Sequence, residues 1–200
     1  MPQLTSEKAA ARTEQESRPL VVGIGGTLRP YSSSELALRA ALADAEATGA
    51  DTRLITAREL ELPMYDPGAV DLTPQARHLI DTVRRADAVM IAAAGYHGGV
   101  SGLLKNALDY LQELADDQRP YLHDIPVGCI VTAAGWQAGV TTLASLRSTV
   151  HALRGWPSPL GVVINSATPQ FRDNGEAVDE KVAAQLAAMA EQVTRFARRS

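Results

Sequence analysis

The stretch with the clearest potential for chemistry runs from Gly25 to Ser34 and reads Gly-Gly-Thr-Leu-Arg-Pro-Tyr-Ser-Ser-Ser. It follows a short apolar run and precedes a segment with helical spacing, so we predict a turn between a first strand and a first helix. Its glycines allow a ligand to approach the backbone, and the first amides of a helix attract anions. Further donors are Thr27, Arg29, Ser32, Ser33 and Ser34. These donors predict a phosphate site; an ordinary polar loop with a serine N-cap is the alternative.

Two sharper phosphate motifs do not match this stretch. A P-loop requires Lys and then Ser or Thr after its second glycine, and no lysine occurs between Lys8 and Lys105. A Rossmann turn requires a glycine at its sixth position, where this chain has Leu28. The turn therefore favours a terminal phosphate monoester, whose dianion accepts many hydrogen bonds, over a triphosphate or a pyrophosphate.

Apolar runs alternate with segments of helical spacing along the chain. The strands and helices that they predict must hold this turn in place. Continuous runs, typical of strands covered on both faces, occur at 20–24, 88–93, 127–131 and 160–164, with a weaker one at 52–56. Helical spacing follows each run, and in the last helix we expect a buried stripe of Val178, Val182, Leu186, Met189, Val193 and Phe196. The pattern predicts an α/β fold: a flavodoxin-like, doubly wound parallel sheet of five strands in the order 2-1-3-4-5, with helices on both faces.

In that strand order, ligands bind outside the carboxyl ends of the central strands, so three loops should meet at one site. The second loop supplies Gly95, Tyr96, His97, Gly98, Gly99 and Ser101, and the third supplies Gly135, Trp136 and Gln137. Glycines beside isolated large side chains suit a flat ligand that lies against the backbone. Together with the phosphate turn, these loops predict a planar ligand with a phosphate tail, and flavin mononucleotide (FMN) is such a ligand.

Composition narrows the class of protein. The 200 residues are 46% hydrophobic and 21% charged, which predicts one globular domain over 20–200 after an N-terminal arm at 1–19. The net charge of −4 argues against a nucleic-acid surface. Every apolar run is far shorter than the ~20 residues of a membrane span, so we expect no membrane partner and a cytoplasmic location. The single cysteine, Cys129, is predicted to be buried and inert, and we predict no metal site because metal-ligand spacing is missing.

Three motifs resemble the NAD(P)H-dependent FMN reductase family. They are the run from Gly26 to Ser34, the pair Tyr96-His97 with Ser101-Gly102 and the segment 104–109, and the loop from Gly135 to Gly139. The similarity extends over about 20–164. The resemblance implies that Thr27, Arg29, Ser32 and Ser34 hold the FMN phosphate, that Tyr96, His97 and Gly98 line the flavin, and that Gly135, Trp136 and Gln137 close its other side. Family members often have a proline and a glutamate or other residue before the tyrosine, whereas this chain has Ala94 and Gly95.

The resemblance also implies an activity. Such an oxidoreductase transfers hydride from NADPH or NADH to N5 of FMN and supplies reduced flavin to a partner monooxygenase or another acceptor, and it forms a homodimer or homotetramer. Because the flavin carries the chemistry, we assign no catalytic acid, base or nucleophile. Two alternatives remain: a quinone or azo reductase with prosthetic FMN, and a flavodoxin-like electron carrier. Carriers are typically strongly acidic, so the mild charge of −4 favours the enzyme.

Overall fold

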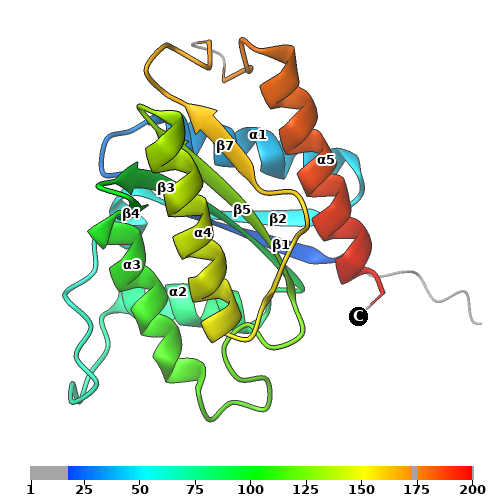
Figure 1. Cartoon of the computed structure of the whole chain (residues 1–200). Coiled ribbons are helices and arrows are strands. Elements are labelled where there is room, and N and C mark those ends of the chain that lie inside the picture. Colours follow the sequence, from blue (N-terminus) through cyan, green and yellow to red (C-terminus); the bar gives the residue numbers. More distant parts are fainter. Residues whose placement is uncertain (1–17, 173–174, 200) are drawn as a thin grey trace, which may run out of the picture.

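Figure 1 shows a central sheet with helices on both sides. The structure is a computed structural model that describes residues 18–172 and 175–199. Most of the predicted N-terminal arm, residues 1–17, lies outside the described residues. Its last two residues bond to the domain: Arg18 Nη2 donates to the carbonyl oxygen of Ala50 at 2.7 Å, and the carbonyl oxygen of Pro19 accepts from the amide of Asp51 at 3.0 Å.

The sheet runs in the order β2-β1-β3-β5-β6; β4 pairs antiparallel with β3, and β7 pairs parallel with β5. Its strands are β1 (Leu20–Gly25), β2 (Asp51–Thr56), β3 (Ala88–Tyr96), β4 (Gly99–Val100), β5 (Pro126–Ala133), β6 (Trp156–Pro157) and β7 (Val162–Asn165). The α-helices are α1 (Ser33–Ala47), α2 (Pro74–Arg84), α3 (Gly102–Asp109), α4 (Trp136–Ala152) and α5 (Glu180–Ala197), with short 3₁₀ helices η1 (Ala57–Leu60) and η2 (Tyr110–Leu114). Helices α1 and α5 cover one face, and α2, α3 and α4 cover the other.

The predicted parallel, doubly wound sheet is present, but the prediction of five strands in the order 2-1-3-4-5 is wrong, because the sheet has seven strands. The expected edge strand at 160–164 corresponds to β7, and a further short strand, β6, pairs with β5 ahead of it. Strand β4 arises where the chain turns back on β3 after Tyr96. Both extra strands lie outside the predicted apolar runs, so the runs do not reveal them.

Burial on both faces of the sheet explains the continuous apolar runs. In β3, Val89 and Ile91 belong to the core under α2, α3 and α4, whereas Met90 and Ala92 belong to the core under α1 and α5. Cys129 of β5 is buried as predicted, and burial raises the pKa of its thiol to about 12. The two core layers hold the ends of β1, β3 and β5 side by side.

The predicted stripe of the last helix is only partly buried. Val178 precedes the N-cap Asp179 and is 50% exposed, and Phe196 in the last turn is 46% exposed. The other four residues of the stripe are buried. The prediction relied on the spacing of apolar residues and therefore included Val178, although the helix begins only after the N-cap Asp179. Within the described part of the chain, no helix has both the length and the apolarity required to cross a bilayer.

Candidate functional site

The turn predicted to bind phosphate leaves the sheet at the end of β1 and leads into α1. Gly25 and Gly26 have φ angles of 153° and 96°, in the range that favours glycine. The Gly25 carbonyl accepts from Thr56 Oγ1 at 2.6 Å, and the Gly26 amide donates to the Ala92 carbonyl at 3.2 Å. A Cβ at Gly25 would overlap the carbonyl oxygen of Ala92. The turn is therefore fixed to strands on both sides of β1.

The hydroxyls of the turn divide between cap and surface. Ser32 is the N-cap of α1, and its Oγ accepts from the amide of Glu35 at 3.4 Å. Ser34 is also buried, with its Oγ 3.4 Å from that of Ser32, whereas Ser33 is half-buried. Thr27 Oγ1 accepts from the amide of Arg29 at 3.2 Å, and Arg29 is exposed. The serine N-cap that the alternative interpretation expected is therefore present. Arg29 and Thr27 lie near it and are accessible to a ligand.

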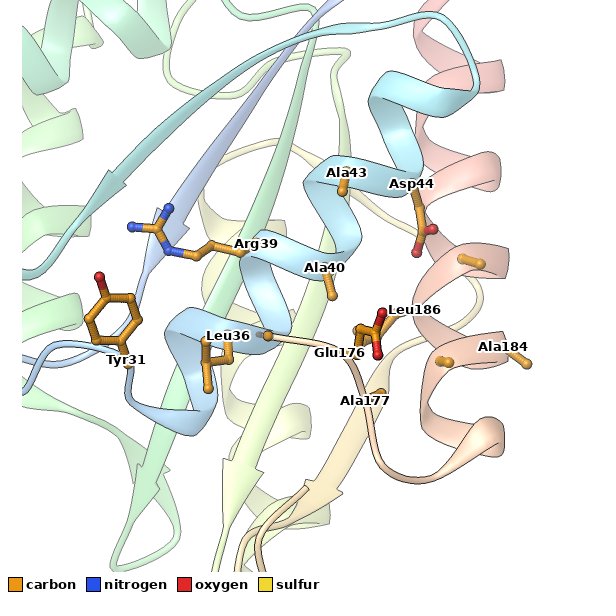
Figure 2. Close-up of a pocket in the computed structure, with 13 residues that line it drawn as sticks. Tyr31, Leu36, Arg39, Ala40, Ala43, Asp44, Glu176, Ala177, Ala184 and Leu186 are labelled. Atoms are coloured by element: carbon orange, nitrogen blue, oxygen red, sulfur yellow. The ribbon is translucent and has the colours of Figure 1, made fainter. Parts of the chain in front are cut away.

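Glu35 is a residue of this turn that we did not predict. Its side chain is 4% exposed, and its Oε2 accepts from the amide of Tyr31 at 3.1 Å. Its Oε1 accepts from Arg39 Nε at 2.9 Å and lies 2.8 Å from Nη2, and Figure 2 shows the Arg39 side chain extending from α1 toward Tyr31. Tyr31 has a φ of 55°, so the carboxylate holds a left-handed residue at the end of the turn. The Ser-x-x-Glu capping pattern at 32–35 is the sequence signal that indicates such a role.

The second loop is a tight hairpin between β3 and β4. Tyr96 pairs with Gly99, and the two residues between them, His97 and Gly98, have φ angles of 52° and 83°. Positive φ at both central positions is what a type I′ turn requires. The hairpin leaves Tyr96 57% exposed and His97 exposed. Its polar and aromatic tips therefore point away from the core.

The ends of this hairpin are packed against neighbouring helices. A Cβ at Gly95 would lie 2.9 Å from Thr142 Oγ1 of α4, and that hydroxyl donates to the carbonyl of Gly99 at 3.4 Å. Ser101 is buried as the N-cap of α3 and accepts from the amide of Leu104 at 3.3 Å. Ser101 therefore caps α3, and its hydroxyl oxygen already accepts one hydrogen bond within the protein.

The third loop begins α4. Gly135 is the N-cap and has no side chain with which to satisfy the first amides of the helix. Trp136 is 62% exposed, and Gln137 is also exposed. The contact of α4 with the hairpin places these two loops next to each other. The third loop thus combines a helix N-terminus with an exposed indole at the carboxyl edge of β5.

A buried amide on α3 fixes another loop beside this region. Asn106 Oδ1 accepts from the amide of Tyr65 at 2.8 Å, and Nδ2 donates to the carbonyls of Leu62 and Pro63 at 3.3 and 2.8 Å. Tyr65 also donates from its hydroxyl to Glu113 at 2.7 Å, and burial and this hydrogen bond raise the pKa of Tyr65 to about 12. Sequence reasoning included Asn106 in a motif without assigning it a role. Only its burial identifies it as an anchor.

Two cavities have Tyr31 of the first turn in their lining. A groove of about 830 Å³ lies between α1 and α5, lined by Leu36, Ala40, Ala43 and Asp44 of α1 and by Glu176 of the segment before α5 (Figure 2). Burial raises the pKa of Asp44. A cavity of about 370 Å³ adjoins the groove. Among the described residues, no group of three His, Cys, Asp or Glu side chains is placed to hold a metal ion.

The structure thus brings the three predicted loops to one edge of the sheet, because β1, β3 and β5 are neighbours and end together. Arg29, Tyr96, His97, Trp136 and Gln137 are exposed there, Ser32, Ser34 and Ser101 are buried as caps or beside one, and the remaining candidates Thr27, Ser33, Gly95, Gly98, Gly99 and Gly135 are half-buried. A doubly wound α/β protein with such loops belongs to the class that binds ligands at the carboxyl edge of its sheet.

Comparisons with known proteins identify the family. Residues 19–169 match NADPH-dependent FMN reductase, and the chain belongs to this family. It is 28% identical over 162 residues to an NAD(P)H-dependent FMN reductase of Pseudomonas aeruginosa, which covers 80% of this chain and 85% of that protein. It is 30% identical over 117 residues to an NADPH azoreductase of Bacillus sp., over 58% of this chain and 62% of the azoreductase. The chain thus spans less than two thirds of the azoreductase.

Among solved structures, the chain resembles FerB, a flavoenzyme NAD(P)H:(acceptor) oxidoreductase from Paracoccus denitrificans. The TM-score is 0.76 at 20% identity, over 90% of this chain and 98% of FerB. At this level of identity the likeness shows the fold, and it confirms the predicted α/β flavodoxin-like class.

Proposed function

We propose that this protein is an NAD(P)H-dependent FMN reductase that binds FMN across the three loops and transfers hydride to it from NADPH or NADH. The observation that carries the proposal is the meeting of a donor-rich turn with two loops bearing exposed rings, at the carboxyl edge of the sheet, in a chain of this family. The exposed Arg29 guanidinium and the N-terminus of α1, which begins at the end of the turn, suit a phosphate.

Each loop has its own part in this proposal. The first binds the phosphate, the second lies along the flavin, and the third closes the other side of the ring. The residues assigned are Thr27, Arg29, Ser32, Ser33 and Ser34 for phosphate, Gly95, Tyr96, His97, Gly98, Gly99 and Ser101 for the ribityl chain and ring edge, and Gly135, Trp136 and Gln137 for the ring. Because Ser32 and Ser101 are caps, they act mainly by placing the amides of α1 and α3.

The protein's contribution to the reaction is positioning. Bound FMN supplies the hydride acceptor. The uncapped amides at the start of α4 can donate hydrogen bonds where negative charge develops on the ring. Tyr96 and Trp136, both more than half exposed, would help to position the nicotinamide against the flavin. No acid or base of the chain is needed at the reacting atoms.

The test is to follow oxidation of NADPH and NADH by the purified protein with and without added FMN. Turnover that rises with free FMN supports the reductase that uses FMN as a substrate. Absence of nucleotide oxidation in both conditions, with FMN still bound, would instead support an electron carrier.

A second candidate is a quinone or azo reductase that keeps FMN as a prosthetic group. It is favoured by the 30% identity to a protein named NADPH azoreductase. A purified protein that is yellow, and that oxidises NADPH rapidly only when a quinone or azo dye is present, would select this candidate.

We also infer a homodimer or homotetramer and, for the reductase, a monooxygenase or other acceptor that takes the reduced flavin. The family resemblance implies a subunit contact near the helix at 105–111. Light scattering of the purified protein measures the assembly, and a monomer at micromolar concentration would rule it out.

Replacing Arg29 with alanine is expected to weaken FMN binding by about 1.5–3 kcal/mol, because a charge-assisted hydrogen bond to the phosphate is lost. Quenching of flavin fluorescence on titration measures the dissociation constant. Riboflavin, which has no phosphate, is the matched ligand, and its affinity should not change. An unchanged dissociation constant for FMN would remove Arg29 from the phosphate site.

Replacing Glu35 with alanine is expected to weaken FMN binding about tenfold, because the hydrogen bond that holds Tyr31 is lost and the turn must be ordered when the ligand binds. The same titration measures the effect. Glu180→Ala, which removes an exposed first-turn carboxylate of α5, is the control and should bind FMN like the wild type. Equal affinities for both variants would show that the turn does not depend on Glu35.

A further inference from the structure

The cavity of about 370 Å³ beside the phosphate turn is bounded by two segments. Tyr31 of the first turn and Ser33 and Leu36 of α1 line it on one side, and residues 169–172 of the segment after β7 line it on the other. That segment leaves the carboxyl end of β7, so the cavity lies at the same edge of the sheet as the three loops. Phe171 and Arg172 lie beyond the residues that match the family.

The lining of this cavity combines flat apolar walls with a cation. Tyr31, Leu36 and Phe171 supply rings and an aliphatic side chain, and Arg172 supplies the cation. Among the described residues that line it, none carries a carboxylate. Such a lining suits a purine ring attached to a phosphate, and the volume lies in the lower part of the range of small-molecule sites.

The backbone of the lining segment is held in place. The Val178 amide donates to the Gln170 carbonyl at 2.8 Å, and Phe171 forms a bridge with Ala177. Gln170 Nε2 donates to the carbonyl and the Oγ1 of Thr168, at 3.2 and 2.9 Å. The wall that carries Arg172 is therefore supported by hydrogen bonds before any ligand binds.

The Arg172 guanidinium can exchange its present partner for a phosphate. It lies 3.1 Å from Glu176, and the two side chains are 62% and 63% exposed. Ion pairs this exposed contribute only about 0–1 kcal/mol, so a dianion that accepts two hydrogen bonds competes well with Glu176. Arg39 is less free than Arg172 to exchange its partner, because its partner Glu35 is only 4% exposed and also holds the amide of Tyr31.

We propose that this cavity binds the phosphorylated adenosine of NADPH and that Arg172 pairs with its 2′-phosphate. The inference rests on the proposed function, since it places the far end of the hydride donor at the edge where the flavin binds. NADH has the same adenosine without the 2′-phosphate. The chain therefore prefers NADPH, and Arg172 accounts for the preference.

Steady-state kinetics at saturating FMN test this assignment with Arg172→Ala, Arg172→Lys and the control Arg195→Ala, an exposed arginine of α5. Arg172→Ala should raise the KM for NADPH about 10- to 100-fold, with kcat and the KM for NADH nearly unchanged. Arg172→Lys should recover part of the loss, and Arg195→Ala should match the wild type. An unchanged KM for NADPH in Arg172→Ala, or a wild type without preference for NADPH, overturns the assignment.

A binding measurement separates this assignment from the proposed function. Calorimetry with 2′,5′-ADP on the full chain requires no turnover and no flavin, and we expect binding that Arg172→Ala weakens about 10- to 100-fold. Adenosine 5′-diphosphate, without the 2′-phosphate, should bind the wild type and the variant equally. Failure of the reductase assay together with selective 2′,5′-ADP binding would overturn only the reductase. Equal affinity of wild type and Arg172→Ala for 2′,5′-ADP would overturn only the subsite.

Discussion

Replacing Gly25 with alanine is expected to lower the free energy of unfolding by about 3–5 kcal/mol. The added Cβ would overlap the carbonyl oxygen of Ala92 and lie 2.9 Å from the carbonyl carbon and the amide nitrogen of that residue. These are backbone atoms of β3, held on the far side by the ladder to β5, so they cannot move aside. The φ of 153° at Gly25 is also unfavourable for a residue with a side chain.

Urea denaturation measures this loss, and Gly99→Ala is the matched control. Among the described residues, no atom lies within 4 Å of a Cβ built at Gly99, so its stability should change by less than about 0.5 kcal/mol. If the Gly25 variant folds but is weakened, its affinity for FMN should also fall, because the turn begins at this residue. A Gly25→Ala protein as stable as the wild type would contradict the close approach of β1 to β3.

The second large effect is expected at Asn106. Its side chain is 6% exposed and makes three hydrogen bonds to the backbone of 62–65. Asn106→Ala removes all three bonds and leaves the amide of Tyr65 and two carbonyls without these partners. At about 1 kcal/mol for each bond, we expect a loss of about 3 kcal/mol in the free energy of unfolding.

Lys105→Ala is the control for Asn106, because Lys105 lies next to it on α3 and makes only an exposed contact with Asp109. That variant should lose at most about 0.5 kcal/mol. Hydrogen exchange adds a local measurement, since the Tyr65 amide should lose protection in Asn106→Ala and keep it in Lys105→Ala. Retained protection of Tyr65 in the alanine variant would show that the loop is held by other contacts, such as the hydroxyl of Tyr110 on the Pro63 carbonyl.

The loops of the site were predictable because each depends on local features. The runs around Ile24, Ile91 and Ile130 are apolar on both faces, which indicates buried parallel strands, and the residues after each run are glycines with hydroxyls or large rings. Parallel strands that neighbour one another bring their carboxyl ends together. The predicted adjacency of the runs at 20–24, 88–93 and 127–131 was therefore enough to place Arg29, Tyr96 and Trp136 at one edge. Their contacts with FMN stay predictions.

Other features depend on contacts between distant segments. Asn106 and Pro63 are 43 positions apart, and the cavity at Ser33 is closed by Phe171 and Arg172, which follow β7. No periodicity reports such a contact. The partial exposure of the last-helix stripe, with Val178 ahead of the N-cap, has the same origin, because the sheet and not the spacing decides which turns are covered.

By itself, the sequence determined the doubly wound class of the fold and the three loops that meet at its edge, since apolar runs, helical spacing and glycine turns act over a few residues. Only the tertiary structure decided that the sheet has seven strands, that Glu35 holds the end of the turn at 25–34, and that Arg172 and Ser33 line one cavity. These features arise from pairing and packing between segments that are separate in the chain, and their geometry exists only once the two core layers have formed.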